Sequence, residues 1–257
     1  MLFTQYLHLD RLQYLSDEKI KYKVIYMTIT IIEENNNKYK IEPIKMANDL
    51  IIPNVDDPLP NKFGFFLLLI GKPNSGKTNF WLNLLQKNKK RNSYYKKFDR
   101  VHIFSNSLKT ITSKINLAED RIHHGCDDLE SVVEEEKDSE NKILFIIDDC
   151  VTDLKDSDFM LKLIYNRRHL GKSISIIITS QVYNKISLKI RKCCTDLVLF
   201  NTGNKKELQS VYDDLINIDK DDYYEIIKHC FSGSSHDFIF FKTEDGSFYH
   251  CFNKLIF

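Results

Sequence analysis

The fold is decided by the stretch Gly71-Lys72-Pro73-Asn74-Ser75-Gly76-Lys77-Thr78, which satisfies the pattern G-x-x-x-x-G-K-[ST] in full. An apolar run precedes it and a helical pattern follows it, which is the context that a phosphate-binding loop requires. The glycines permit close backbone approach, so successive N–H groups and the positive helix end can surround phosphate oxygens. We expect Lys77 to reach the β and γ phosphates of a nucleotide and the Thr78 hydroxyl to ligate Mg²⁺. The alternative is a strand-to-helix turn with an incidental lysine.

Outward from this loop, short apolar runs alternate with helical patterns. The runs are rich in β-branched and aromatic residues and cover Phe65 to Ile70, Val101 to Ser105, Ile143 to Ile147, Ser175 to Thr179 and Leu197 to Phe200. Three helices are predicted. The first begins within residues 76–78, the second covers residues 128–137, and the third covers residues 158–168. This alternation predicts an α/β fold whose central, mainly parallel sheet is flanked by helices on both faces.

A second acidic motif ends the run Ile143-Leu144-Phe145-Ile146-Ile147-Asp148-Asp149. A buried strand that ends in acid delivers a carboxylate to the metal beside the phosphates, as in a Walker B element. We expect Asp148 to hold Mg²⁺ through water and Asp149 to polarise the attacking water. Asp149 is one methylene shorter than the Glu more often found at this position. The alternative is two solvated acids at the start of a turn.

Two polar features follow this motif. Gln181 comes directly after the apolar run that ends in Thr179 and Ser180. A polar side chain at that strand tip can touch the γ-phosphate or the lytic water, although it can also be a helix cap or a surface residue. Arg167 and Arg168 stand near a predicted helix end, where arginines also favour the negative pole of the helix.

Taken in order, these stretches resemble the poxvirus-type DNA-packaging ATPases, which have relatives across nucleocytoplasmic large DNA viruses and virophages. The resemblance covers roughly residues 60 to 202 and rests on residues 71–78, 145–149, 168–169, 176–181 and 190–191. The two Walker motifs are generic, whereas the Arg-His and Thr-Ser-Gln stretches are more specific. These ATPases belong to the FtsK-HerA superfamily, so the resemblance implies a RecA-like P-loop NTPase fold of the additional-strand kind.

The resemblance also implies an Mg²⁺-dependent ATPase and assigns roles to residues. ATP would bind Gly71, Lys72, Pro73, Asn74, Ser75, Gly76, Lys77, Thr78 and Phe80, with Mg²⁺ at Thr78 and Asp148. The catalytic set would be Lys77, Asp149, Gln181 and a trans-acting Arg168, although Arg167 leaves that last choice open. Such proteins act as rings that drive double-stranded DNA into a preformed capsid. The implied partners are DNA, further copies in a pentamer or hexamer, and capsid or portal components, in the viral factory of the host cytoplasm or in the virion.

The chain ends carry strand signals outside this region. Val24 to Glu33 and Tyr39 to Ile44 predict a β-hairpin, and a proline-containing connector then sets a boundary near residue 55. Phe238 to Lys242 and Phe248 to Phe252 flank an Asp-Gly pair and predict a second hairpin. We therefore divide the chain into an N-terminal extension (1–55), an ATPase core (56–235) and a C-terminal β-hairpin (236–257).

Composition restricts the classes of partner. Lys and Arg number 37 against 36 Asp and Glu, so the net charge of +1 provides no overall attraction for nucleic acid or membrane. Six cysteines show no CxxC pair and no histidine spacing typical of a zinc site, which favours reduced thiols in an intracellular compartment. The longest apolar run, Phe63 to Ile70, is too short to span a bilayer, so we expect a soluble protein.

Any DNA contact must then come from local clusters of basic residues. The first group is interleaved with Tyr94 and Tyr95 and comprises Lys87, Lys89, Lys90, Arg91, Lys96, Lys97 and Arg100. The second comprises Lys185, Lys189, Arg191 and Lys192. Phosphate contact by either group would be independent of sequence and sensitive to salt, as a translocating motor requires. A solvated loop is the alternative for each.

Other functions compete with the packaging motor. A GTPase is one, because Asn204-Lys205-Lys206-Glu207 approaches the guanine-reading motif N-K-x-D, but the last residue is Glu. Nucleotide kinases and helicases share the phosphate loop. A nucleotide-gated assembly factor that moves nothing is a further alternative, since Walker motifs describe nucleotide chemistry and not the work coupled to it.

Overall fold

The computed structural model describes residues 50–87, 90–108, 121–150 and 158–257, all of them within the compact unit Lys45–Phe257. The N-terminal hairpin predicted between residues 24 and 44 lies outside the described residues, as does Lys89. No helix among the described residues has the length and apolar character needed to cross a membrane.

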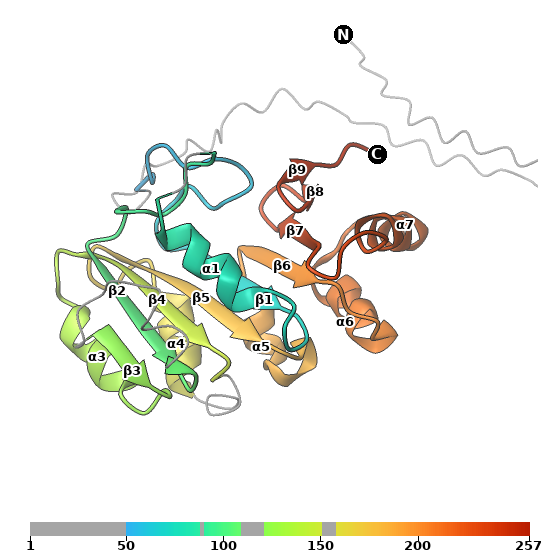
Figure 1. Cartoon of the computed structure of the whole chain (residues 1–257). Coiled ribbons are helices and arrows are strands. Elements are labelled where there is room, and N and C mark those ends of the chain that lie inside the picture. The colour runs from blue at the N-terminus through green and yellow to red at the C-terminus, as the bar shows by residue number, and fades with distance from the viewer. Residues whose placement is uncertain (1–49, 88–89, 109–120, 151–157) are drawn as a thin grey trace, which may run out of the picture. The chain divides into compact units, whose positions relative to one another are not determined.

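One mixed sheet of nine strands organises the described residues, in the order β3-β2-β4-β5-β1-β6-β7-β8-β9 (Figure 1). The strands are β1 (Phe66–Ile70), β2 (Arg100–Ser105), β3 (Ile122–His124), β4 (Lys142–Asp148), β5 (Ser173–Ser180), β6 (Asp196–Phe200), β7 (Phe238–Lys242), β8 (Phe248–His250) and β9 (Asn253–Lys254). Strands β1 to β6 run parallel to one another, and β7, β8 and β9 each pair in antiparallel register with the strand before them. All five strands predicted for the core are confirmed.

The position of β5 decides the type of nucleotide-binding fold. It pairs with β1, the strand before the phosphate loop, and with β4, the strand that ends in Asp148. One extra strand therefore separates the two Walker strands, which confirms the additional-strand P-loop NTPase fold. β1 and β5 are buried along their whole length, as expected of central parallel strands covered on both faces.

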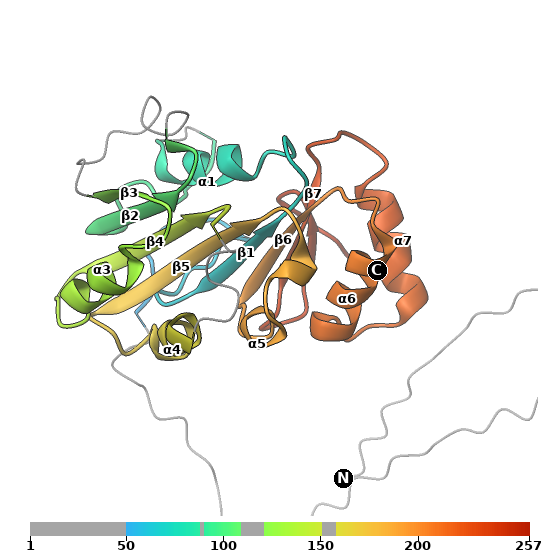
Figure 2. The same cartoon turned by 90° about the horizontal axis from the view of Figure 1, so that it is seen from below.

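Helices cover the two faces unequally, as Figure 2 shows. The helices are α1 (Lys77–Leu85), α3 (Leu129–Glu136), α4 (Asp158–Asn166), α5 (Leu188–Arg191), α6 (Lys205–Leu215) and α7 (Lys220–Cys230). Residues of α1 pack with alternate residues of β1 in one apolar core, and residues of α3 to α7 pack with the other set in a second core. The predicted helices are confirmed, whereas α5, α6, α7 and the short strands β3 and β9 were not predicted.

The predicted C-terminal hairpin is also present, and it is part of the main sheet. β7 pairs with β6 in antiparallel register, with Val198 opposite Phe240, and β8 pairs with β7. Phe238, Phe240 and Tyr249 contribute to the same apolar core as α1. The hairpin therefore lies beside the helix that follows the phosphate loop.

Candidate nucleotide-binding site

The phosphate loop joins β1 to α1 and requires glycine at two points. Gly76 has φ +109°, a conformation that L side chains rarely adopt. A Cβ on Gly71 would lie 2.7 Å from the Cβ of Phe200, so no larger residue fits there without movement. The loop is thus shaped by its own glycines and by the end of β6.

Lys77 is the buried cation of this loop. Its Nζ donates to the backbone oxygens of Gly71, at 2.7 Å, and Lys72, at 3.3 Å. Burial lowers the pKa of Lys77, and the carboxylates of Asp149 and Asp148 oppose that change. The ammonium group is therefore held at the loop and is poorly hydrated, which strengthens its attraction for an anionic phosphate.

Asp148 has one oxygen held by the protein and the other directed toward Thr78. Its Oδ1 accepts hydrogen bonds from Trp81 Nε1, at 3.0 Å, and from Thr179 Oγ1, at 2.9 Å. Its Oδ2 lies 3.4 Å from Thr78 Oγ1. This places a carboxylate oxygen beside the Thr78 hydroxyl, so that Thr78 could ligate Mg²⁺ while Asp148 accepts a hydrogen bond from a water bound to that ion.

Burial raises the pKa of Asp148, and the hydrogen bonds from Trp81 and Thr179 oppose that rise. The nearby positive charge of Lys77 acts in the same direction as the hydrogen bonds. The two donors thus favour the ionised carboxylate that Mg²⁺ requires.

Asp149 and Gln181 meet at the ends of β4 and β5. Gln181 Nε2 donates to Asp149 Oδ2 at 3.3 Å, and both residues are exposed. Asp149 has φ +55°, and its backbone N–H donates to Thr179 Oγ1 at 3.0 Å. Asp tolerates this left-handed conformation better than most residues, and such positions are common at functional sites. Thr179 therefore orients both acids, one through its hydroxyl proton and one through its oxygen.

The two arginines after α4 differ sharply in environment. Arg167 is buried, and its guanidinium donates to the backbone oxygens of Gly64, at 2.7 Å, and Ile164, at 2.6 Å. Burial, and secondarily the charge of Arg168, lowers the pKa of Arg167 to about 10. Arg168 is exposed. Arg167 is thus a structural residue, and only Arg168 can reach a neighbouring molecule.

Arg168 lies at the amino edge of the parallel strands, opposite the phosphate loop. A Cβ on Gly64, which precedes β1, would lie 2.9 Å from Arg168 Cγ, whereas the loop follows the end of β1. The five residues of β1 span roughly 16 Å at about 3.3 Å each. Arg168 therefore cannot contact a phosphate in the loop of its own chain.

A cavity of about 380 Å³ adjoins the phosphate loop on the α1 face. Its lining combines aromatic side chains, among them Phe80, Phe200, His236 and Phe252, with polar ones such as Asn79, Asn83 and Arg91, beside Gly76 of the loop. Phe80 stacks on Phe252 with ring centroids 5.9 Å apart and an interplanar angle of 7°. An aromatic cavity beside a phosphate loop has the size and chemistry to receive a nucleobase. Phe80, predicted to bind the nucleotide, is part of this lining.

Sequence reasoning missed three residues at the site. Trp81 and Thr179 hold Asp148, and His236 Nδ1 lies 3.2 Å from the backbone oxygen of Ser75 in the phosphate loop. Thr179 stands in the Thr-Ser-Gln stretch that was singled out, so its place at the strand tip was a usable signal. Nothing in the local pattern marks Trp81 or His236.

The guanine-reading motif has a different explanation. Asn204 is the N-cap of α6, and its Oδ1 accepts from the backbone N–H groups of Lys206 and Glu207. Glu207 is buried and accepts from the backbone N–H of Tyr183 and the hydroxyl of Thr202. This stretch is therefore the start of a helix, and the structure gives no support to a guanine site.

Comparison with known proteins agrees with this geometry. Residues 58–230 match the family described as Poxvirus A32 protein, which is more than half of the chain. This chain belongs to the poxvirus A32 protein family. No curated protein sequence matches it.

Solved structures support the fold of this A32-family chain. It is similar to the genome packaging NTPase B204 from Sulfolobus turreted icosahedral virus 2 in complex with ATP-gammaS, with 15% identity, a TM-score of 0.52, and coverage of 74% of this chain and 98% of that one. It is also similar to the DNA-packaging ATPase B204 from Sulfolobus turreted icosahedral virus, with 15% identity, a TM-score of 0.53, and coverage of 73% and 97%. At this identity the likeness concerns the fold. Both Walker motifs, Gln181 and Arg168 lie within the A32 family match, whereas β7 and β8 lie beyond it.

Proposed function

We propose that this chain is an Mg²⁺-dependent ATPase that moves double-stranded viral DNA into a preformed capsid. The observation that carries the proposal is the meeting of Lys77, Thr78, Asp148, Asp149 and Gln181 at one edge of the sheet, in a chain of the A32 family. The B204 proteins of similar fold are described as packaging enzymes, and one is bound to an ATP analogue.

The residues of the site have separate tasks in ATP hydrolysis. The loop N–H groups and Lys77 would hold the β and γ phosphates. Thr78 and Asp148 would hold Mg²⁺, which neutralises charge that develops on the transferred phosphoryl group. Asp149 would accept a proton from the attacking water, and Gln181, 3.3 Å from that carboxylate, would orient the water and respond to the γ-phosphate.

In a ring of identical subunits, Arg168 of one subunit could reach the nucleotide site of the next. The exposed Arg168 would complete the nucleotide site of the next subunit, where an arginine in trans is worth about 10³ to 10⁵ in turnover. Arg168→Ala should bind ATP but lose most hydrolysis. Mixing Arg168→Ala with Lys77→Ala should restore part of the activity, because some interfaces then join an intact loop to an intact arginine.

Arg167→Ala is not an adequate substitute in that experiment, since it leaves two backbone oxygens without their buried donor. Subunit exchange must be demonstrated with labelled chains. If labelled subunits exchange and no activity returns, Arg168 does not act in trans.

The DNA surface is assigned from exposed lysines. In the first basic group, Arg91 donates to Asp57 O, Arg100 pairs with Glu136 at 2.6 Å, and Tyr94 is buried, so these residues have structural roles. In the second group, Arg191 is buried and pairs with Asp214 at 3.0 Å.

The exposed members of the second group are Lys185, Lys189 and Lys192. They lie on the short segment that follows Gln181, which links them to the nucleotide site through the backbone, so we favour this group. Replacing these three lysines with Gln should make the plot of the logarithm of the DNA-binding constant against the logarithm of salt concentration less steep. The slope should fall by about 0.9 for each phosphate contact that is lost. The matched control replaces Lys87, Lys90 and Lys96, which are exposed in the first group.

The decisive experiment measures ATP turnover with and without duplex DNA, followed by single-molecule observation of DNA movement. We expect stimulation by DNA of any sequence and ATP-dependent movement, both absent in Lys77→Ala. ATP turnover without any response to DNA would refute the motor and favour a nucleotide-gated assembly factor or a kinase. We place the protein in the viral factory of the host cytoplasm and in the virion, with capsid or portal components as partners, which fractionation of infected cells would test.

A further inference from the structure

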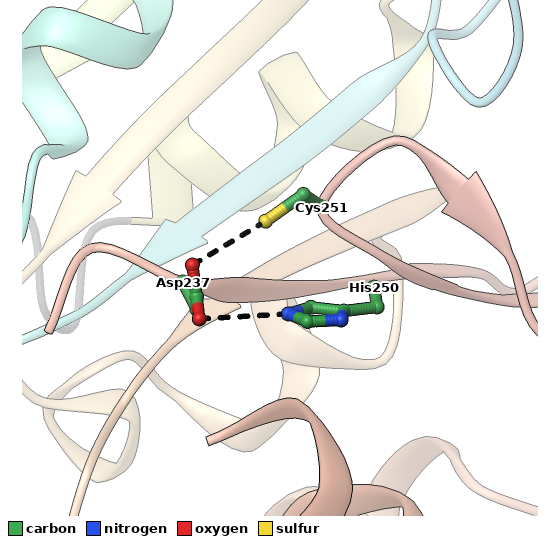
Figure 3. A group of neighbouring side chains, drawn as sticks. All are labelled: Asp237, His250 and Cys251. Atoms are coloured by element: carbon green, nitrogen blue, oxygen red, sulfur yellow. Dashed lines mark hydrogen bonds and ion pairs between the residues drawn. The ribbon is translucent and has the colours of Figure 1, made fainter. Parts of the chain in front are cut away.

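Three residues with metal-binding side chains meet where the C-terminal hairpin returns to the start of β7. Figure 3 shows the Asp237 carboxylate between the ring of His250 and the thiol of Cys251. His250 Nε2 lies 3.6 Å from Asp237 Oδ2, and Cys251 Sγ lies 3.9 Å from Asp237 Oδ1. One donor atom from each residue lies within 4.8 Å of the other two. The cluster is distinct from the nucleotide site.

The backbone holds each of these residues in place. Ser234 N–H donates to Asp237 Oδ2 at 2.7 Å, and Asn201 N–H donates to the backbone oxygen of Asp237 at 3.2 Å. His250 ends β8 opposite Ile239 of β7. Cys251 has φ +55°, and its N–H donates to Phe238 O at 2.8 Å. A left-handed residue other than glycine is uncommon, and here it directs the thiol toward Asp237.

His250 Nε2 is the second sign of a ligand. This nitrogen is buried and has no hydrogen-bond partner among the described residues. At 3.6 Å its contact with Asp237 is longer than a hydrogen bond. A buried polar atom left in this state destabilises the fold, and a bound metal would remove that penalty.

The spacing suits a tetrahedral metal better than it suits direct contact. With zinc bonds of about 2.0–2.1 Å to N or O and about 2.3 Å to S, neighbouring ligands lie about 3.3 Å apart for N and O and about 3.6 Å apart for S and O. The observed separations of 3.6 and 3.9 Å involve different oxygens of Asp237, and one donor atom from each of the three residues lies within 4.8 Å of the other two. Side-chain rotations that shorten these separations by about 1 Å would therefore close the site.

We propose that Asp237, His250 and Cys251 bind one Zn²⁺ ion, with water as the fourth ligand. A thiolate, an imidazole and a carboxylate together match zinc, whereas Mg²⁺ and Ca²⁺ require oxygen ligands. The Ser234 N–H orients the ligating carboxylate, as outer-shell donors do in zinc sites.

The ion would fasten the hairpin to the segment that touches the phosphate loop. Asp237 follows His236, and His236 Nδ1 lies 3.2 Å from Ser75 O. Phe252 follows Cys251 and stacks on Phe80 in the cavity beside the loop. Metal at this site therefore fixes two neighbours of the candidate nucleotide pocket from outside it.

Cobalt is the probe, because it replaces zinc and reports its ligands spectroscopically. The full chain, freed of metal and kept reduced with a phosphine, is titrated with Co²⁺ in the absence of nucleotide. We expect one Co²⁺ per chain, the visible bands of tetrahedral cobalt, the near-ultraviolet band of a cobalt–thiolate bond, and loss of both on addition of Zn²⁺. Co²⁺ at Thr78 and Asp148 would have only oxygen ligands and would give no thiolate band, so the outcome is independent of the ATPase proposal.

Variants identify the ligands. Cys251→Ser should remove the thiolate band and weaken Co²⁺ binding at least about a hundredfold, since even outer-shell changes cost 10- to 100-fold. His250→Gln should weaken binding to a similar degree and still show a thiolate band at high Co²⁺, which keeps the test valid if Cys251→Ser does not fold. Cys193→Ser is the matched control, because Cys193 is also half-buried but lies after α5. Absence of a thiolate band in the wild-type chain, or equal loss in Cys193→Ser, would overturn the site.

Discussion

Replacing Trp81 with Phe tests whether the indole positions the metal-binding carboxylate. Trp81 is the only tryptophan of the chain and is fully buried, and its Nε1 donates to Asp148 Oδ1 at 3.0 Å. Phe keeps an aromatic ring in the core but has no N–H. A hydrogen bond to a charged group contributes about 1.5–3 kcal/mol, so we expect the free energy of unfolding to fall by at least that amount.

The effect on Mg²⁺ follows from the geometry of Asp148. The carboxylate keeps Thr179 but loses one of the two donors on Oδ1, and loss of an outer-shell donor weakens metal binding about 10- to 100-fold. Because the Trp81 hydrogen bond also lowers the pKa of Asp148, the variant should hold a proton more readily. The defect in Mg²⁺ binding should therefore deepen as the pH falls.

The assay is an Mg²⁺ titration of ATP turnover at a fixed, saturating ATP concentration, with metal-free ATP binding measured in parallel. Leu82→Ala is the control, because Leu82 is buried on the same helix and such a change costs about 2–5 kcal/mol. We expect Trp81→Phe to raise the Mg²⁺ requirement at least about tenfold and Leu82→Ala to leave it unchanged. Equal Mg²⁺ requirements in the two variants would show that the indole serves packing alone.

The remaining predictions concern the two Walker acids and a buried acid of β6. Asp149→Asn should bind ATP and Mg²⁺ normally while turnover falls about 10²- to 10⁴-fold, whereas Asp148→Asn should lose Mg²⁺ affinity. Calorimetry measures the Mg²⁺ affinity, and single-turnover kinetics measures the chemical step. Equal loss of Mg²⁺ affinity in both variants would contradict the division of roles. Burial raises the pKa of Asp196 from 3.8 to about 7. Its proton is therefore bound more tightly in the folded chain, so its contribution to stability is complete below pH 3.8, falls as the pH rises, and is lost above about pH 7. Urea unfolding of Asp196→Asn at several pH values should lack this loss, on the order of 4 kcal/mol, and an unchanged pH profile would contradict the assignment.

The sheet was predictable from the sequence because its central strands are buried on both faces. The run from Phe65 to Ile70 contains no polar side chain and stands directly before the phosphate loop, and the run from Ile143 to Ile147 stands directly before the two Walker acids. The helices α6 and α7 lacked a comparable signal. Their apolar residues are spaced among many charged ones, and their N-caps, Asn204 and Asp219, are residues that also begin ordinary turns.

The candidate site was predictable only as far as its residues belong to a sequence motif. A residue expected to touch a nucleotide or a metal carries a motif because the chemistry restricts its type. Trp81 and His236 act through other residues, and their partners are distant in sequence: Trp81 contacts Asp148, and His236 contacts Ser75. The cluster of Asp237, His250 and Cys251 was missed for the same reason, since the pairing of β7 with β8 brings Asp237 to the adjacent residues His250 and Cys251, and an adjacent His-Cys pair alone is no metal motif.

Arg167 and Arg168 show why a motif alone does not choose between neighbours. Residues adjacent in sequence at a helix end point in directions about 100° apart, so one can face the core while the next faces solvent. Arg167 faces inward and its guanidinium is held by the oxygens of Gly64 and Ile164, which join the end of α4 to the segment before β1. That anchor fixes the backbone from which Arg168 projects. The buried arginine therefore sets the position of the backbone, and the exposed arginine lies on the sheet edge opposite the phosphate loop of its own chain.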